Sequence, residues 1–361
     1  MYNTRPRTTS LLGKSLLFIL LALTPTPSAP YAWAQGGQAP APPARQANTE
    51  TELESGKTVE REIKGGEAHA YTVTLRRGEF LRAVATSQDV DVLATVYRPG
   101  GEKLLASDLL KYPGPEPLSF VAEREGVYRL EVSVAGTQAV RGRYVLTSEM
   151  KAAATEADKE RLAAEGVLRE AMALEREGSK ESLDSSVERY GEGARRWRGA
   201  RDKFWEAFAL HYSGRASSRL GEQQKALEFY NQALALRRAV GDREGEATTL
   251  NDIGAVYRGL GELQKALEFL NLALPLRRAV GDRAGEALTL DNLMELHRDD
   301  LAAPPLAIFY GKQAVNTYQQ LRGNIQGMDK ETQKTYLKTV EKHYRQLADL
   351  LLSQGRLPEA E

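Results

Sequence analysis

The chain has 361 residues, with 49 Lys and Arg against 49 Asp and Glu, so its formal net charge at pH 7 is zero. This length allows two or three domains, and the balanced charge excludes the broad basic surface typical of nucleic-acid-binding proteins. The absence of cysteine excludes disulfides, thiolate metal ligands and a cysteine nucleophile within these residues.

Residues 1–34 have the layout of a secretory signal peptide. A basic start precedes a short apolar run at residues 16–23, and the small-x-small sequence AWA ends at Ala34. The run is far shorter than the ~20 residues that span a bilayer. We therefore predict cleavage after Ala34 and export to the periplasm or the extracellular space, with no membrane span after removal of the signal. An uncleaved membrane anchor is the alternative.

Residues 35–52 are rich in Pro, Ala and Gln and predict a linker. From residue 53 to residue 149 the hydrophobic period becomes 2, with Gly-rich turn signals between short runs. The pattern predicts an antiparallel, jelly-roll-like β-sandwich. Its strands are expected at 58–64, 68–76, 79–86, 91–98, 103–107, 118–123, 126–134 and 143–148.

This segment resembles the bacterial pre-peptidase C-terminal domain. The residues that carry the resemblance are Gly66-Glu67, Tyr71, Arg77-Gly78-Glu79, Asp91-Val92, Val96-Tyr97, Pro99-Gly100-Gly101 and Gly126-Val127-Tyr128. The resemblance implies a module that can bind calcium or polymers. Asp89 and Asp91 offer carboxylates for such a cation, but we interpret them as polar turn residues and expect no cofactor.

Residues 150–181 contain no Pro and are rich in Ala, Glu, Lys and Leu, which predicts a helical connector that caps the next segment. Residues 222–301 are two copies of one 40-residue unit, identical at about 24 of 40 positions. Each copy has two apolar stripes at helical spacing, separated by a Val-Gly-Asp turn in which Gly241 is the expected helix C-cap. Each unit is therefore predicted to be an antiparallel helix pair that stacks on its neighbours.

The units resemble the tetratricopeptide repeat, in the 40-residue variety found in kinesin light chain. The resemblance implies an all-α superhelical solenoid over residues 182–361, with a degenerate unit at 182–221, an insertion at 302–305 and a last repeat truncated at Glu361. We expect the chain to be an incomplete product. The packing positions implied are Ala226, Tyr230, Ala233, Leu250, Gly254, Tyr257, Ala266, Leu270 and Ala273.

In such repeats the first helix of each unit lines a concave groove, so the resemblance also implies a binding surface. The groove positions are Phe208, His211, Arg215, Arg219, Thr248, Asn251, Ala255, Arg258, Leu288, Asp291, Glu295 and Arg298. They differ between copies while the packing positions stay the same, which fits either a variable binding face or drift on a solvated one. Their mixture of basic, acidic and amide side chains suits an extended polar peptide.

No catalytic constellation is evident. None of the four histidines (His69, His211, His297 and His343) has a partner at metal-ligand spacing, and no nucleophile motif is present. The sequence therefore predicts a non-enzymatic, exported scaffold that binds a partner protein or peptide. Two alternatives stay open. The chain could be the front part of a CHAT-domain (caspase-like) peptidase, because residues 311–357 resemble the segment that leads into that domain. It could instead be a cell-surface or polymer-binding protein that acts through the sandwich.

Overall fold

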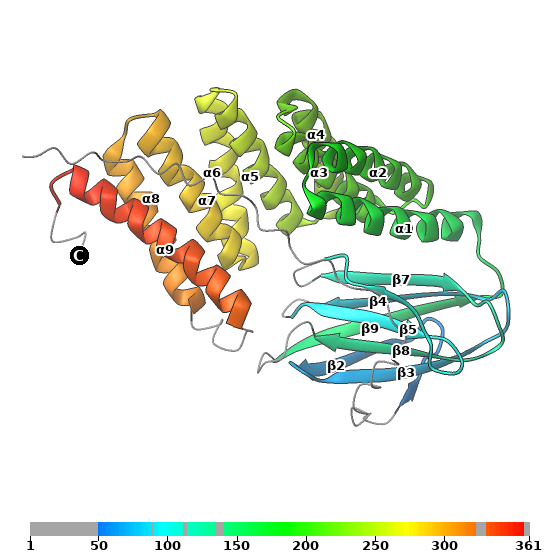
Figure 1. The fold of residues 1–361 in the computed structure, drawn as a ribbon. Coiled ribbons are helices and arrows are strands. Elements are labelled where there is room, and N and C mark those ends of the chain that lie inside the picture. Colours follow the sequence, from blue (N-terminus) through cyan, green and yellow to red (C-terminus); the bar gives the residue numbers. More distant parts are fainter. Residues whose placement is uncertain (1–49, 88–89, 111–113, 135–140, 323–329, 357–361) are drawn as a thin grey trace, which may run out of the picture. The chain divides into compact units, whose positions relative to one another are not determined.

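The structure is a computed structural model that describes residues 50–87, 90–110, 114–134, 141–322 and 330–356. The predicted signal peptide, nearly all of the predicted linker and Asp89 lie outside these residues. Strands come first in the chain and helices follow as successive antiparallel pairs (Figure 1). The predicted fold class, a β-sandwich followed by an all-α repeat region, is confirmed.

The strands form two sheets. One has the order β1-β3-β8-β5-β6 and the other β2-β9-β4-β7, and every pairing is antiparallel except the short β1–β3 pair. The first sheet contains β1 (Thr51–Glu52), β3 (Ala68–Leu75), β8 (Gly126–Val134), β5 (Val92–Tyr97) and β6 (Lys103–Ser107). The second contains β2 (Thr58–Lys64), β9 (Arg141–Lys151), β4 (Phe80–Ser87) and β7 (Pro115–Val121).

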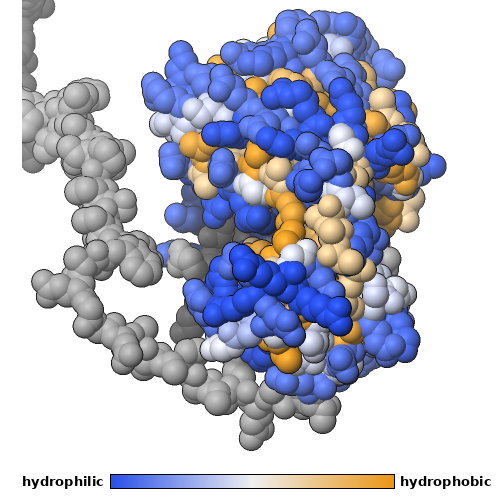
Figure 2. Space-filling model, turned by 90° about the vertical axis from the view of Figure 1, so that its right-hand side faces the viewer, coloured by the Kyte–Doolittle hydropathy of each residue, from blue (hydrophilic) through white to orange (hydrophobic). Residues whose placement is uncertain are grey.

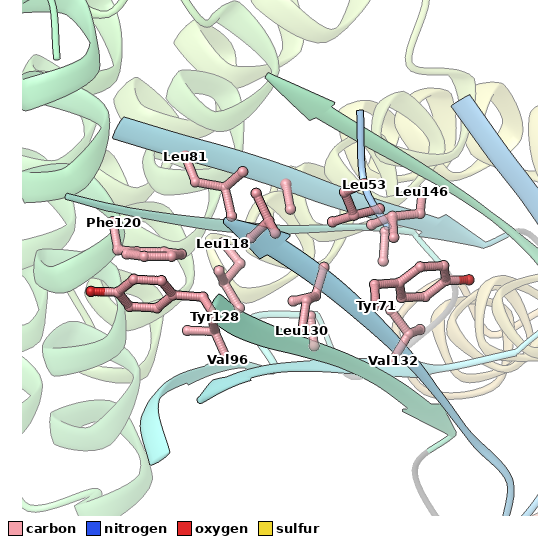
Figure 3. Close-up of a cluster of buried hydrophobic side chains, with 14 of the residues drawn as sticks. Leu53, Tyr71, Leu81, Val96, Leu118, Phe120, Tyr128, Leu130, Val132 and Leu146 are labelled. Atoms are coloured by element: carbon pink, nitrogen blue, oxygen red, sulfur yellow. The ribbon is translucent and has the colours of Figure 1, made fainter. Parts of the chain in front are cut away.

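The period-2 pattern creates the core between the sheets. Alternate residues of β3 and β8 are buried, among them Tyr71, Val73, Tyr128 and Leu130, while Thr72 and Arg129 between them are partly exposed. Figure 3 shows Tyr128 beside Phe120 of the other sheet, and their ring centroids are 5.1 Å apart. Burial of such large side chains stabilises a fold by roughly 1.5–3 kcal/mol each, so the sandwich has a core of its own.

The helices end and begin where the turn chemistry predicts. Their bounds are α1 (Glu156–Glu177), α2 (Lys180–Gly199), α3 (Lys203–Arg219), α4 (Gln223–Val240), α5 (Arg243–Gly259), α6 (Leu263–Val280), α7 (Arg283–Glu295), α8 (Pro304–Arg322) and α9 (Lys330–Ser353). Gly241 ends α4 with φ +74°, a conformation that glycine adopts without strain. Asp242 then caps α5 by accepting a hydrogen bond from the Gly245 amide at 2.9 Å.

The same turn contains a buried arginine in both copies. Arg237 and Arg277 are each 4 % exposed, and each forms an ion pair with the capping aspartate that follows it, Asp242 or Asp282. A Cβ atom at Gly285 would clash with the Arg277 guanidinium group. The glycine three residues after the aspartate therefore leaves room for the arginine.

The predicted insertion at 302–305 has a structural counterpart that the sequence did not indicate. After α7 the helix widens into a π-helix, η1 (Leu296–Asp300), and α8 starts at Pro304. The left-handed turn residue is Ala302, with φ +47°, where the preceding unit has Gly261 with φ +76°. The extra chain length is thus taken up partly inside the helix.

On the face drawn in Figure 2, hydrophilic residues cover most of the surface and hydrophobic ones form smaller patches between them. None of the helices in the described ranges is long and apolar enough to cross a membrane.

Candidate binding face of the helical repeats

Each repeat contributes a first and a second helix. We call the surface formed by α1, α3, α5, α7 and α9 the first-helix face, and α2, α4, α6 and α8 the second helices. Small residues allow the two helices of a repeat to approach closely: a Cβ atom at Gly254 would lie 2.9 Å from Leu270. Eight of the nine packing positions are buried, and Tyr257 is half-buried.

A row of polar contacts joins successive first helices; we call it the polar ladder. His211, Asn251 and Asp291 occupy equivalent positions, 40 residues apart, on α3, α5 and α7. His211 lies with Nδ1 3.3 Å from the Thr249 hydroxyl and Nε2 3.4 Å from the Asp252 carboxylate, both on α5.

The next two rungs repeat this arrangement with different chemistry. Asn251 Oδ1 accepts hydrogen bonds from Thr289 Oγ1 at 3.1 Å and from Asn292 Nδ2 at 3.0 Å, both on α7. Asp291 Oδ2 accepts a hydrogen bond from Tyr318 OH at 2.7 Å and lies 3.1 Å from His343 Nδ1 on α9. The ladder thus runs from α3 to α9 and fixes the register of neighbouring first helices.

Burial determines the charge of the ladder residues. Desolvation, aided by the nearby Arg237, lowers the pKa of His211 well below its ordinary value, so its imidazole is neutral. Desolvation, with the nearby Glu295 charge, raises the pKa of Asp291 to about 7. These groups stabilise contacts between repeats and are not offered to solvent.

Four predicted groove residues are therefore corrected. Phe208, His211, Asn251 and Asp291 are at most 3 % exposed, and Phe208 belongs to a hydrophobic core with Trp205. All four side chains are enclosed by neighbouring parts of the helical repeats, so they cannot line an open surface. The other groove positions keep some exposure: Arg215, Arg219, Thr248, Ala255, Arg258, Leu288, Glu295 and Arg298.

Arg215 and Arg219 share one partner, Glu175 of α1, which the sequence did not single out. Arg215 donates from Nε and Nη2 to the two carboxylate oxygens, both at 2.8 Å, and its guanidinium lies 3.9 Å from the Tyr212 ring centre. Arg219 Nη1 donates to the Glu175 carbonyl oxygen at 3.1 Å. Burial opposes ionisation of Glu175, but donors including Arg215 and Tyr190 outweigh it and lower its pKa. The sequence could have indicated Glu175, because it stands 40 residues, the length of one repeat, before Arg215.

Arg258 has the opposite surroundings. Its guanidinium contacts three carboxylates, those of Glu295 at 2.8 Å, Asp299 at 3.3 Å and Asp300 at 2.6 Å. Arg298 lies beside them and pairs with Asp299 at 2.6 Å. A shallow depression of about 410 Å³ adjoins this cluster, lined by Arg298, Asp299, Gln346, Asp349, Leu350 and Ser353. The α1–α3 end of the first-helix face thus has surplus cations, and the end at η1 has surplus carboxylates.

Comparison with known proteins identifies the repeats. Residues 241–320 match the family model described as Tetratricopeptide repeat. The matched residues run from Gly241, which ends α4, into α8, so the predicted repeat type is confirmed over these residues. A search of curated proteins finds no match.

Several solved structures are similar in fold. The pre-peptidase C-terminal domain of a collagenase from Bacillus anthracis is 13 % identical, with 29 % of this chain and 99 % of that chain covered and a TM-score of 0.25. Kinesin light chain TPR-like repeats from Podosopora anserina are 16 % identical, with coverage of 56 % and 90 % and a TM-score of 0.38. A Rap protein complexed with Competence and Sporulation Factor is 13 % identical, with coverage of 54 % and 51 % and a TM-score of 0.43. The CHAT-domain link stays a prediction.

Proposed function

We propose that the protein is an exported scaffold that binds a partner protein or peptide on its first-helix face. The observation that carries this proposal is a contrast between equivalent positions. Arg215, Ala255 and Glu295 stand 40 residues apart and offer a cation, a methyl group and an anion at the same place in three repeats. The buried packing position on the second helix is Ala in both copies, at 226 and 266.

The turns between helices do not vary in this way, which favours selection acting on the first-helix face over general sequence drift. An arginine in the last turn of the second helix pairs with a glutamate of the next first helix in three successive units. Arg198 and Glu206, Arg238 and Glu246, and Arg278 and Glu286 lie 2.8, 2.7 and 2.6 Å apart. Partly exposed charges that serve the fold are therefore the same in each unit, whereas the first-helix face changes.

The charged groups of this surface suit binding. Across the described parts of the chain, no group of three or more His, Cys, Asp or Glu could hold a metal ion. The carboxylates of the first-helix face are mostly engaged by arginines, as at Arg258. A surface of paired charges with some unused donors suits reversible recognition of a polar chain.

Export rests on the N-terminal sequence. The basic start, the short apolar run and the AWA site predict a mature protein that begins at Gln35. Mass spectrometry of the N-terminal peptide from the envelope and secreted fractions measures this directly. An intact Met1 in those fractions would contradict the proposal of export by cleavage.

Site-specific photo-cross-linking in the cells that make the protein tests the binding face. Leu288 on α7 and Leu272 on the second helix α6 are matched positions, 46 % and 45 % exposed, and Val127 on β8 is 51 % exposed. A photoreactive amino acid is placed at each position in the intact chain. We expect one discrete protein adduct from position 288 that is missing from position 272. Adducts from position 127 alone would move recognition to the sandwich, and equal adducts from 288 and 272 would contradict a dedicated face.

A further inference from the structure

The α1–α3 end of the first-helix face has an uncompensated positive charge held in place by the fold. Glu175 supplies one carboxylate to two guanidinium groups, those of Arg215 and Arg219, and it is 5 % exposed. Both oxygens of its carboxylate are engaged, because Oε1 and Oε2 accept from Arg215 and Tyr190 OH also donates to Oε2 at 2.8 Å. One positive charge therefore remains at the surface.

Both arginines have unused donors. Glu175 and Tyr212 orient Arg215 through Nε, Nη2 and the ring face, so that Nη1 is not needed for the ion pair. Arg219 uses Nη1, and its Nη2 lies over Gly178, 3.3 Å from where a Cβ atom would stand. The side chains are 43 % and 44 % exposed. Two guanidinium groups are thus pre-oriented with N–H groups available to solvent, which favours recognition of a planar or tetrahedral oxyanion.

We propose that Arg215 and Arg219 form an anion subsite that receives a carboxylate or phosphate group of the bound partner chain. The inference rests on the proposed function and adds the chemistry of one partner residue. Arg258 provides the contrast: three carboxylates already occupy its Nε, Nη1 and Nη2. A partner anion therefore binds at the α1–α3 end and not at η1.

The test uses the labelled intact chain on an array of C-terminally amidated decapeptides of varied polar sequence. The central residue is Glu, Gln, phosphoserine or Ser. We expect Glu or phosphoserine peptides to bind about tenfold more strongly than their neutral counterparts, the usual effect of one charge-assisted hydrogen bond. The ratio of Glu to phosphoserine binding identifies which oxyanion the subsite prefers.

Three variants separate recognition from a purely structural ion pair. Arg219→Gln should abolish the preference for anionic peptides. The control Arg238→Gln, which removes a similarly exposed arginine from the second helix α4, should retain it. Glu175→Gln should increase the preference, because the compensating negative charge is lost while the amide oxygen and the backbone carbonyl of residue 175 still accept hydrogen bonds from the two arginines. A purely structural role predicts instead that Arg219→Gln and Glu175→Gln change binding in the same direction. Melting temperatures identify any variant that fails to fold, and the ratio of Glu to Gln peptide binding by the unsubstituted chain then decides the question.

Equal binding of Glu and Gln peptides, including no binding of either, overturns the anion subsite. That result leaves the proposed function standing if position 288 still forms its adduct. Loss of the adduct at position 288 would instead overturn the proposed function itself.

Discussion

Replacing Gly254 by Ala inserts a methyl group where α5 contacts α6. The new Cβ atom would lie 2.9 Å from Leu270 Cγ and 3.2 Å from the carbonyl oxygen of Ala266, whereas optimal carbon contacts lie at about 3.5–4.0 Å. The leucine side chain can shift, but the carbonyl belongs to the backbone of α6. The two helices must therefore separate by several tenths of an ångström, and overpacking of this kind typically costs about 1–3 kcal/mol.

Gly259 provides a matched control in the same helix. A Cβ atom there meets nothing within 4 Å, so Gly259→Ala has only the gain in helix propensity, up to about 1 kcal/mol. Gly259 is the last residue of α5, so its gain does not exceed the gain at the interior position 254. The difference in free energy of unfolding between the two variants is therefore a lower bound on the steric cost. Urea unfolding followed by circular dichroism should show Gly254→Ala to be less stable than Gly259→Ala by about 1–3 kcal/mol. Equal stability, or a more stable Gly254→Ala, would refute the close approach of α5 and α6.

Two further substitutions test neighbouring features. Ala266→Leu should lower the melting temperature, because Ala266 is fully buried and overpacking costs about 1–3 kcal/mol; an unchanged melting temperature would show that the helix register is wrong. The folded-state pKa of Asp291, about 7, exceeds its ordinary value of 3.8. Its stabilising contribution is therefore complete below about pH 4 and lost as pH rises through 7. Asp291→Asn, which copies the equivalent Asn251, should weaken the pH dependence of the melting temperature over that range; an unaltered profile would exclude Asp291 as its source.

The repeat unit could be predicted from the sequence because its determinants are local or duplicated. Gly241 and Asp242 specify the turn between helices through backbone conformation and capping, which depend on a few adjacent residues. Ala226 and Ala266 recur at the same place in both copies and are both fully buried. The alternation of Tyr71 and Val73 likewise indicated the buried face of a strand.

The polar ladder could not be predicted in the same way. Helical periodicity shows that His211, Asn251 and Asp291 share one face with the exposed positions, but it does not distinguish solvent from a neighbouring first helix. Their partners lie between 27 residues (Asp291 and Tyr318) and 52 residues (Asp291 and His343) away and differ in chemistry at each rung, so no single motif marks them. The complementary Thr249 and Thr289, each 38 residues after a ladder residue, were the available signal.

The π-helix η1 was missed for a related reason. Alignment of the copies places the extra residue at 302–305, after the last apolar position of α7. The structure shows that part of this length is absorbed at Leu296–Asp300, where Arg258 of the preceding unit contacts Asp299 and Asp300. The surplus of carboxylates at this end of the first-helix face depends on that widened turn.

The most direct test of a dedicated binding face is an affinity comparison with the partner captured at position 288. Leu288→Arg and Leu272→Arg introduce the same charge at matched exposure, one on the first-helix face and one on a second helix. Isothermal titration calorimetry with the purified partner should show at least a tenfold weaker affinity, about 1.4 kcal/mol, for Leu288→Arg and no change for Leu272→Arg. An unchanged affinity for Leu288→Arg, or an equal loss in both variants, would contradict recognition on the first-helix face.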